Sequence, residues 1–119
     1  MKLGIVGCRD FTDYKRLCKE VDDFLGELGE SCTTVVSGGA RGGADTLGKQ
    51  YAEEHNLEMI EHLPEWKKYA RAAGPIRNKL IVEDSDAVIA FWNYSDRGTK
   101  STIDLTQKAG KTLKIVDIV

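Results

Sequence analysis

The segment whose residue types most clearly suggest a chemical function is SGGARGGAD, residues 37–45. It follows a β-branched run and precedes residues with helical periodicity, so we expect a turn that joins a strand to a helix. A glycine-rich turn of this kind exposes backbone N–H groups at the positive end of a helix dipole, and both attract phosphate. Arg41 adds a guanidinium group, which matches phosphate geometry. The segment therefore predicts a phosphate-binding loop that works without a metal ion.

Three other segments place unusual polar residues directly after expected strands. Residues 7–9 read Gly-Cys-Arg, residues 73–78 read Ala-Gly-Pro-Ile-Arg-Asn, and residues 96–102 form a second glycine turn ahead of a helix. In an open parallel sheet the carboxyl ends of the strands share one edge, where ligands bind. We therefore expect Arg9, Arg77 and the second turn to face the glycine loop. Bidentate contact with phosphate is the expected role of at least one arginine at this edge.

Some residues in or near these segments have more than one interpretation. Asp45 falls in the first turn of its helix, where helix capping is a sufficient reason for an aspartate. If a ligand binds there, Asp45 would instead bond to ribose hydroxyls or clamp the side chain of Arg41. Trp66 is either a core or lid aromatic or a surface on which a base stacks. His55 and His62 have no partner at metal-ligand spacing. We interpret both histidines as surface residues and expect no metal site.

Several common motifs are absent from the sequence. The first strand is not followed by G-x-G-x-x-G, so an ordinary NAD site is not expected. The glycine loop lacks the lysine and hydroxyl residue of a Walker A loop, and there is no G-x-S-x-G nucleophile turn. The sequence thus predicts no cofactor and no standard hydrolase site.

Composition narrows the class of protein. A length of 119 residues suits one domain, and a formal net charge of -2 gives no basic excess for nucleic-acid binding. No apolar run reaches the length of a membrane span, so no membrane association is expected. The three cysteines are an odd number without metal spacing, which favours a reduced, cytoplasmic setting.

Strand and helix patterns alternate along the whole chain. The order predicts a single three-layer α/β/α domain over residues 1–119, with a five-stranded, mainly parallel sheet. Pro75 is placed at the first position of its helix. The expected strands are residues 3–6, 33–37, 57–63, 87–91 and 113–119, and the expected helices are residues 14–28, 44–52, 75–83 and 99–109.

Taken together, these motifs resemble the YspA-like group of the SLOG superfamily, which is named for the SMF/DprA and LOG proteins. The resemblance rests on residues 7–9, 37–45 and 73–78 and on Gly98-Thr99, and it spans residues 3–116. It implies a Rossmann-like fold whose glycine loops bind nucleotides or nucleotide-derived ligands. Relatives include cytokinin-releasing phosphoribohydrolases, sensor domains for cyclic ADP-ribose-type signals, and a DNA-processing protein that binds single strands. Serine is frequent at the position of Cys8, so we interpret this cysteine as a small packing residue.

One departure from the superfamily concerns catalysis. The phosphoribohydrolases resemble one another in a loop of the form Pro-Gly-Gly-x-Gly-Thr-x-x-Glu, in which the glutamate is catalytic. This sequence keeps Gly98-Thr99, but Thr102 stands where the glutamate would be, and Asp104 comes two residues later. Cleavage by the family mechanism is therefore not expected.

The sequence favours a binding protein for a nucleotide or an ADP-ribose-like ligand, acting as a sensor or a sequestering module. Homo-oligomer formation is expected by analogy with SLOG relatives. The alternative is a nucleotide hydrolase of the phosphoribohydrolase type, with Asp45, Asp86 or Asp104 as its carboxylate; a weaker alternative is single-stranded DNA binding. The predicted ligand-binding residues are Gly7, Cys8, Arg9, Ser37, Gly38, Gly39, Ala40, Arg41, Gly42, Asp45, Trp66, Arg77, Asn78, Gly98, Thr99 and Thr102.

Overall fold

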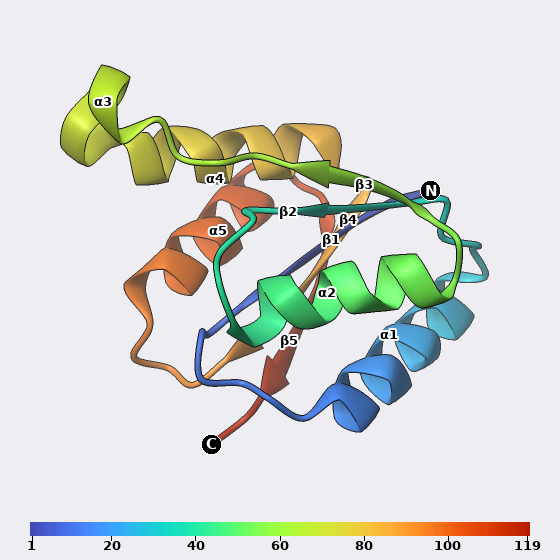
Figure 1. Ribbon diagram of the computed structural model, residues 1–119. Helices are drawn as coiled ribbons and strands as arrows, with labels where there is room; N and C mark the ends of the chain where they lie inside the picture. The colour runs from blue at the N-terminus through green and yellow to red at the C-terminus, as the bar shows by residue number, and fades with distance from the viewer.

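The apolar runs of the sequence form a five-stranded sheet in the computed structural model, which describes residues 1–119 (Figure 1). The strand order is β3-β2-β1-β4-β5, and every neighbouring pair is parallel. The predicted α/β fold is confirmed, with a sheet that is parallel throughout. The strands are β1 (Lys2–Gly7), β2 (Thr34–Ser37), β3 (Glu58–Glu61), β4 (Ala87–Trp92) and β5 (Thr112–Asp117).

Two pairs of helices cover the two faces of the sheet. α1 (Tyr14–Leu28) and α2 (Gly43–Glu54) pack on one face, and α4 (Ala73–Asp84) and α5 (Arg97–Lys108) pack on the other (Figure 1). A short helix, α3 (Trp66–Tyr69), and a 3₁₀ turn, η1 (Ala70–Ala72), lead from β3 into α4. None of the helices has the length and apolar composition needed to cross a lipid bilayer.

The two-residue period of the strands divides the apolar side chains between two cores. Ile5 of β1 packs on the side of α1, in the same cluster as Leu17. Val6 faces the opposite side and shares a cluster with Ile81 of α4 and Ile103 of α5. The last buried side chain of β1 therefore points to the α4–α5 face, at the carboxyl end of the sheet.

The direction in which the chain adds strands reverses at β1. From β1 the chain builds β2 and β3 toward one edge, then crosses to the other side of β1 to build β4 and β5. Right-handed crossovers place the helices of the two halves on opposite faces. The loops that follow β1 and β4 therefore run to opposite faces of the sheet and leave a gap between them. This place is the topological switch point, where open parallel sheets bind ligands.

The structure differs from the sequence prediction at the start of α4. The helix begins at Ala73, so Pro75 is its third residue, not its first. The polar segment before α4 also forms regular structure: it contains α3 and then η1, which runs directly into α4. Pro75 still lies in the first helical turn, where its missing N–H costs no helical hydrogen bond.

Candidate functional site

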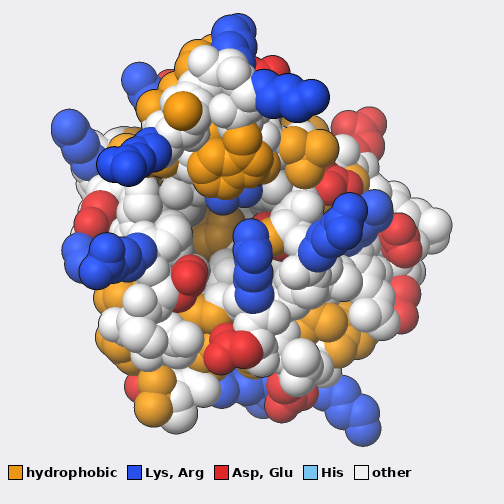
Figure 2. All heavy atoms as spheres, turned by 60° about the vertical axis from the view of Figure 1, so that its left-hand side comes forward, with side chains coloured by type: hydrophobic (Ala, Val, Ile, Leu, Met, Phe, Trp, Pro, Cys, Tyr) orange, Lys and Arg blue, Asp and Glu red, His pale blue; other side chains and the backbone are white.

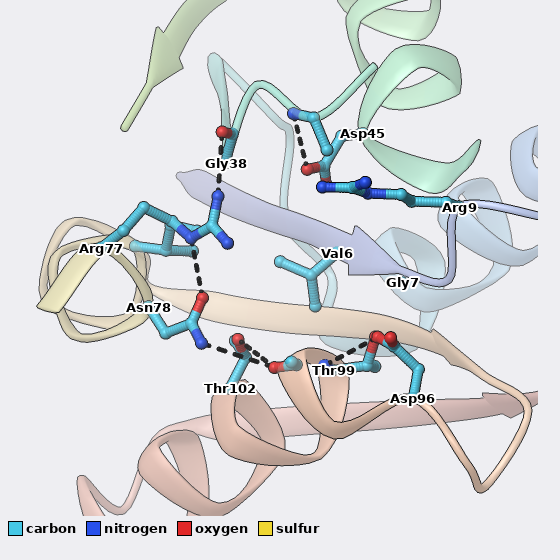
Figure 3. Close-up of a pocket in the computed structure, with 13 residues that line it drawn as sticks. Val6, Gly7, Arg9, Gly38, Asp45, Arg77, Asn78, Asp96, Thr99 and Thr102 are labelled. Atoms are coloured by element: carbon cyan, nitrogen blue, oxygen red, sulfur yellow. Dashed lines mark hydrogen bonds between the residues drawn. The ribbon is translucent and has the colours of Figure 1, made fainter. Parts of the chain in front are cut away.

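A pocket opens at the switch point, with a volume of about 310 Å³. Figure 2 shows this hollow near the middle of the face toward which the strands point, with Lys and Arg side chains around it. We call it the switch-point pocket. The residues that line it are Val6, Gly7, Arg9, Gly38, Ala40, Asp45, Arg77, Asn78, Ile81, Asp96, Gly98, Thr99 and Thr102 (Figure 3).

The glycine loop is held against the end of β1 by a contact that only glycine permits. Gly43 has a φ of +66°, and a Cβ atom there would lie 2.3 Å from both the Cα of Arg9 and the carbonyl oxygen of Cys8. The next residue, Ala44, donates its backbone N–H to the same Cys8 oxygen at 3.2 Å. This close approach brings Arg9 beside the start of α2, where its side chain points toward Asp45 (Figure 3).

Arg77 reaches into the pocket from α4 and is fixed at two points. Its Nη1 donates to the carbonyl oxygen of Gly38 at 3.1 Å, and its Nε donates to Oδ1 of Asn78 at 2.9 Å. The absence of a side chain at Gly38 makes room, because a Cβ atom there would lie 2.4 Å from Nη1 of Arg77. Burial lowers the pKa of the Arg77 guanidinium from its ordinary value, but an arginine remains charged at neutral pH.

The start of α5 forms the third wall of the pocket. Asp96 caps the helix: its Oδ2 accepts the backbone N–H of Thr99 at 3.0 Å and also the Thr99 hydroxyl. The carbonyl oxygen of Gly98 accepts from Oγ1 of Thr102 at 3.2 Å and, through a long hydrogen bond of 3.5 Å, from Nδ2 of Asn78. The backbone N–H of Gly98 has no acceptor within the chain. A donor at the positive end of α5 is thus free at the pocket.

Asp45 is the titratable group with the most altered environment in the pocket. Its Oδ2 accepts the backbone N–H of Ala40 at 3.1 Å. Burial raises the pKa of Asp45 to about 6, although the Ala40 hydrogen bond and the charges of Arg77 and Arg9 oppose that rise. Near neutral pH this carboxyl group can therefore both release and accept a proton.

The arginines of the pocket have no carboxylate ion-pair partner. Every salt bridge in the protein uses a lysine or a histidine, and none uses an arginine. Arg9 and Arg77 therefore both face the pocket with donors available for an added anion.

Most of the predicted site residues meet in this pocket. Those that line it come from four segments separated in sequence by up to 95 residues, counting from Gly7 to Thr102: the end of β1 with the loop after it, the glycine loop with the start of α2, α4, and the start of α5. Beneath the loops, Cys8 and Ser37 are buried and do not line the pocket. Burial is the main cause that raises the Cys8 pKa, so its thiol is not activated. The predicted residues that do line it are Gly7, Arg9, Gly38, Ala40, Asp45, Arg77, Asn78, Gly98, Thr99 and Thr102.

Other predicted residues lie elsewhere. Arg41 is exposed and is not among the lining residues, and no bond joins it to Asp45. Gly39 and Gly42 shape the loop without lining the pocket. Trp66 is 58% exposed at the start of α3, also outside the pocket.

The other two carboxylates considered for catalysis are also distant from this site. Asp86 precedes β4 at the amino end of the sheet, where its Oδ2 accepts the backbone N–H of Lys2 at 2.7 Å. Asp104 lies on the exposed side of α5, paired with Lys100 at 2.9 Å. Asp45 is the only one of the three candidate catalytic residues that lines the pocket.

Sequence reasoning missed three contributions. Val6 and Ile81 line the pocket, but in the sequence they are ordinary core positions and nothing marks them. Asp96 carried a usable signal, because an aspartate three residues before a threonine at a helix start is a capping pattern. His62 is half-buried and not a free surface residue, since its Nε2 lies 2.5 Å from Oδ2 of Asp84.

A comparison with protein families identifies the chain. The family model described as "YspA, cpYpsA-related SLOG family" matches residues 1–69, more than half of the sequence. The match contains the pocket residues from Val6 to Asp45, while those from Arg77 to Thr102 lie beyond it. No curated protein and no solved structure matches the chain. The chain belongs to the YspA, cpYpsA-related SLOG family.

Proposed function

We propose that the protein binds a nucleotide or a nucleotide-derived, ADP-ribose-like phosphate ester in the switch-point pocket, as a sensor or a sequestering module. Membership of the SLOG family indicates nucleotide-related binding or processing at a coarse level. The observation that carries the finer proposal is the pair Arg9 and Arg77, which line one cavity without a carboxylate ion-pair partner.

A phosphate group is the ligand chemistry that this pair suits best. Guanidinium groups bind phosphate oxygens with directed, charge-assisted hydrogen bonds. The free N–H of Gly98 at the start of α5 supplies a further donor at the positive end of a helix. Two carboxylates also line the pocket, but both are engaged: Asp96 caps Thr99, and Oδ2 of Asp45 accepts the backbone N–H of Ala40.

The role that we propose for Asp45 is to bind the sugar of the ligand. An aspartate beside a bound phosphate would be repelled from it, but its oxygens accept hydrogen bonds from the hydroxyl groups of a ribose. One carboxyl oxygen, Oδ2, is used by Ala40. The other oxygen is the acceptor that we assign to a ribose hydroxyl.

Isothermal titration calorimetry with ribose 5-phosphate, AMP, ADP-ribose and cyclic ADP-ribose tests this proposal. We expect at least one of these compounds to bind, and Arg9→Ala and Arg77→Ala each to weaken that binding about tenfold or more. Arg41→Ala is the matched control, because this arginine comes from the glycine loop yet does not line the pocket. Absence of binding by all four compounds, or equal losses in all three variants, would contradict the proposal.

A second candidate function is nucleotide hydrolysis, favoured by one observation. Asp45 lines the pocket with a pKa of about 6, which suits a group that exchanges a proton at neutral pH. Chromatography after prolonged incubation with AMP would show free adenine, and Asp45→Asn would abolish its release. Unchanged AMP with the wild-type protein would leave binding as the function.

A further inference from the structure

The switch-point pocket offers good partners for a phosphate and a sugar but a poor surface for a base. Its lining contains no aromatic side chain, and its only hydrophobic residues are Val6, Ala40 and Ile81. A planar base needs an apolar or planar surface against its faces. A nucleotide held by Arg9 and Arg77 must therefore place its base elsewhere.

A second hollow adjoins the pocket on the side of β3, with a volume of about 200 Å³. We call it the Leu63 hollow. It contains the apolar surface that the first pocket lacks: Leu63 is 63% exposed and Leu80 is 41% exposed. Figure 2 shows hydrophobic side chains gathered directly beside the central hollow. The residues that line the Leu63 hollow are Glu61, His62, Leu63, Glu65, Tyr69, Ala73, Ile76, Arg77 and Leu80.

Arg77 belongs to both hollows. Its bond to the carbonyl oxygen of Gly38 lies at the boundary between them. The next glycine of the loop packs on the other side of this boundary, since a Cβ atom on Gly39 would lie 2.5 Å from Cδ2 of Leu63. A ligand whose phosphate contacts Arg77 in the pocket can thus reach Leu63 past the same side chain. The flat face of the guanidinium is also a stacking surface for a base.

The charges around the Leu63 hollow disfavour a second phosphate and suit a base that donates hydrogen bonds, although Glu61 is also paired with Lys49 at 3.5 Å. Glu61 and Glu65 are carboxylates, and Arg77 is the only lysine or arginine among the lining residues. Carboxylates accept hydrogen bonds from exocyclic amino groups and repel phosphate. Trp66, the aromatic side chain that the sequence suggested for stacking, does not line this hollow, whereas Tyr69 does.

We propose that the Leu63 hollow is the base-binding half of the nucleotide site and receives an amino-bearing base such as adenine, stacked between Arg77 and the apolar side chains of Leu63, α3 and α4. This inference rests on the proposed function, because it assigns the phosphate and the ribose to the switch-point pocket.

Calorimetry with ribose 5-phosphate and AMP separates the two halves, since these probes differ by the base. We expect AMP to bind the wild-type protein about tenfold more tightly than ribose 5-phosphate. In a Leu63→Ala/Leu80→Ala variant this advantage should disappear, while the affinity for ribose 5-phosphate stays within about twofold. Both side chains are exposed, so their truncation leaves the core intact.

Ile115→Ala is the matched control for this variant. Ile115 is an aliphatic residue, 39% exposed, on β5 at the opposite edge of the sheet, so its removal should leave both affinities unchanged. Equal affinity for AMP and ribose 5-phosphate, or an AMP advantage that survives in the double variant, would overturn the base assignment alone. Failure of the wild-type protein to bind both probes would also overturn the base assignment, and failure to bind ADP-ribose and cyclic ADP-ribose as well would overturn the proposed function.

Discussion

The carbonyl oxygen of Gly38 accepts a hydrogen bond from Nη1 of Arg77 at 3.1 Å, across 39 positions of sequence. This bond joins the glycine loop after β2 to α4, which packs on the other face of the sheet from α2. It also joins the part of the chain matched by the SLOG family model to the part beyond the match. Both ligand hollows meet at this arginine, so several predictions concern the geometry around it.

Replacement of Arg77 by lysine tests whether geometry or charge matters at this point. Lysine keeps the positive charge but cannot donate to Gly38 and Asn78 while presenting a further planar donor pair. We expect Arg77→Lys to weaken binding of ribose 5-phosphate about tenfold in calorimetry. An affinity equal to that of the wild type would show that a point charge is sufficient.

The close contact of the glycine loop with β1 predicts a large effect of one methyl group. In Gly43→Ala the new Cβ atom meets the backbone of Cys8 and Arg9 at a positive φ, so we expect a loss of about 3 kcal/mol or more in the free energy of unfolding. Urea denaturation measures this loss.

Gly26→Ala is the control for that substitution. Gly26 lies inside α1 with no atom within 4 Å of an added Cβ, so alanine should stabilise the protein by about 0.5–1 kcal/mol. Similar effects at the two positions would contradict the assigned role of Gly43.

The sequence was sufficient to predict the fold and most of the pocket, because both follow from patterns with a local cause. Strand periodicity placed the sheet, and glycine turns after strands placed the loops at one edge. The direction of individual side chains was not predictable in this way. Arg41 lies within the glycine motif yet is exposed outside the pocket, whereas Ile81 lines it from an ordinary helical core position. These differences depend on how each loop and helix packs against the sheet, which no local pattern specifies.

The raised pKa of Asp45 predicts a pH dependence of stability. Because the pKa is about 6 in the folded protein and 3.8 in its ordinary state, the folded protein holds this proton more tightly than the unfolded chain does. The contribution of Asp45 to the free energy of unfolding therefore falls as the pH rises from about 4 to about 6, and it stays low at pH 7.

Asp45→Asn removes this dependence, since asparagine stays neutral and can still accept the Ala40 N–H. We expect the variant to exceed the wild type in stability by on the order of 1 kcal/mol at pH 7 and by much less at pH 4. Thermal unfolding at the two pH values measures the difference. Asp104→Asn, which removes a carboxylate at an exposed site on α5, is the control, and we expect it to give no gain in stability at pH 7.

Asn78 is a positioning residue whose loss should affect both stability and binding. It is buried, accepts from Nε of Arg77 and donates to the Gly98 oxygen, so it connects α4 to the start of α5. We expect Asn78→Ala to cost about 1–3 kcal/mol of unfolding free energy and to weaken ribose 5-phosphate binding by releasing Arg77. Thr102→Val removes only one bond to the Gly98 oxygen and should weaken binding less. A stability loss with unchanged affinity would show that Asn78 does not position Arg77 for the ligand.

The most direct measurement of the central claim is an NMR titration of ¹⁵N-labelled protein with ribose 5-phosphate. If the switch-point pocket binds a phosphorylated sugar, the largest amide shifts should come from Gly38, Ala40 and Gly98, and the Nε signal of Arg77 should move with them. Amides at the amino end of the sheet, such as that of Asp86, should stay in place. Shifts centred on the amino end, or no shifts at saturating concentration, would contradict the account.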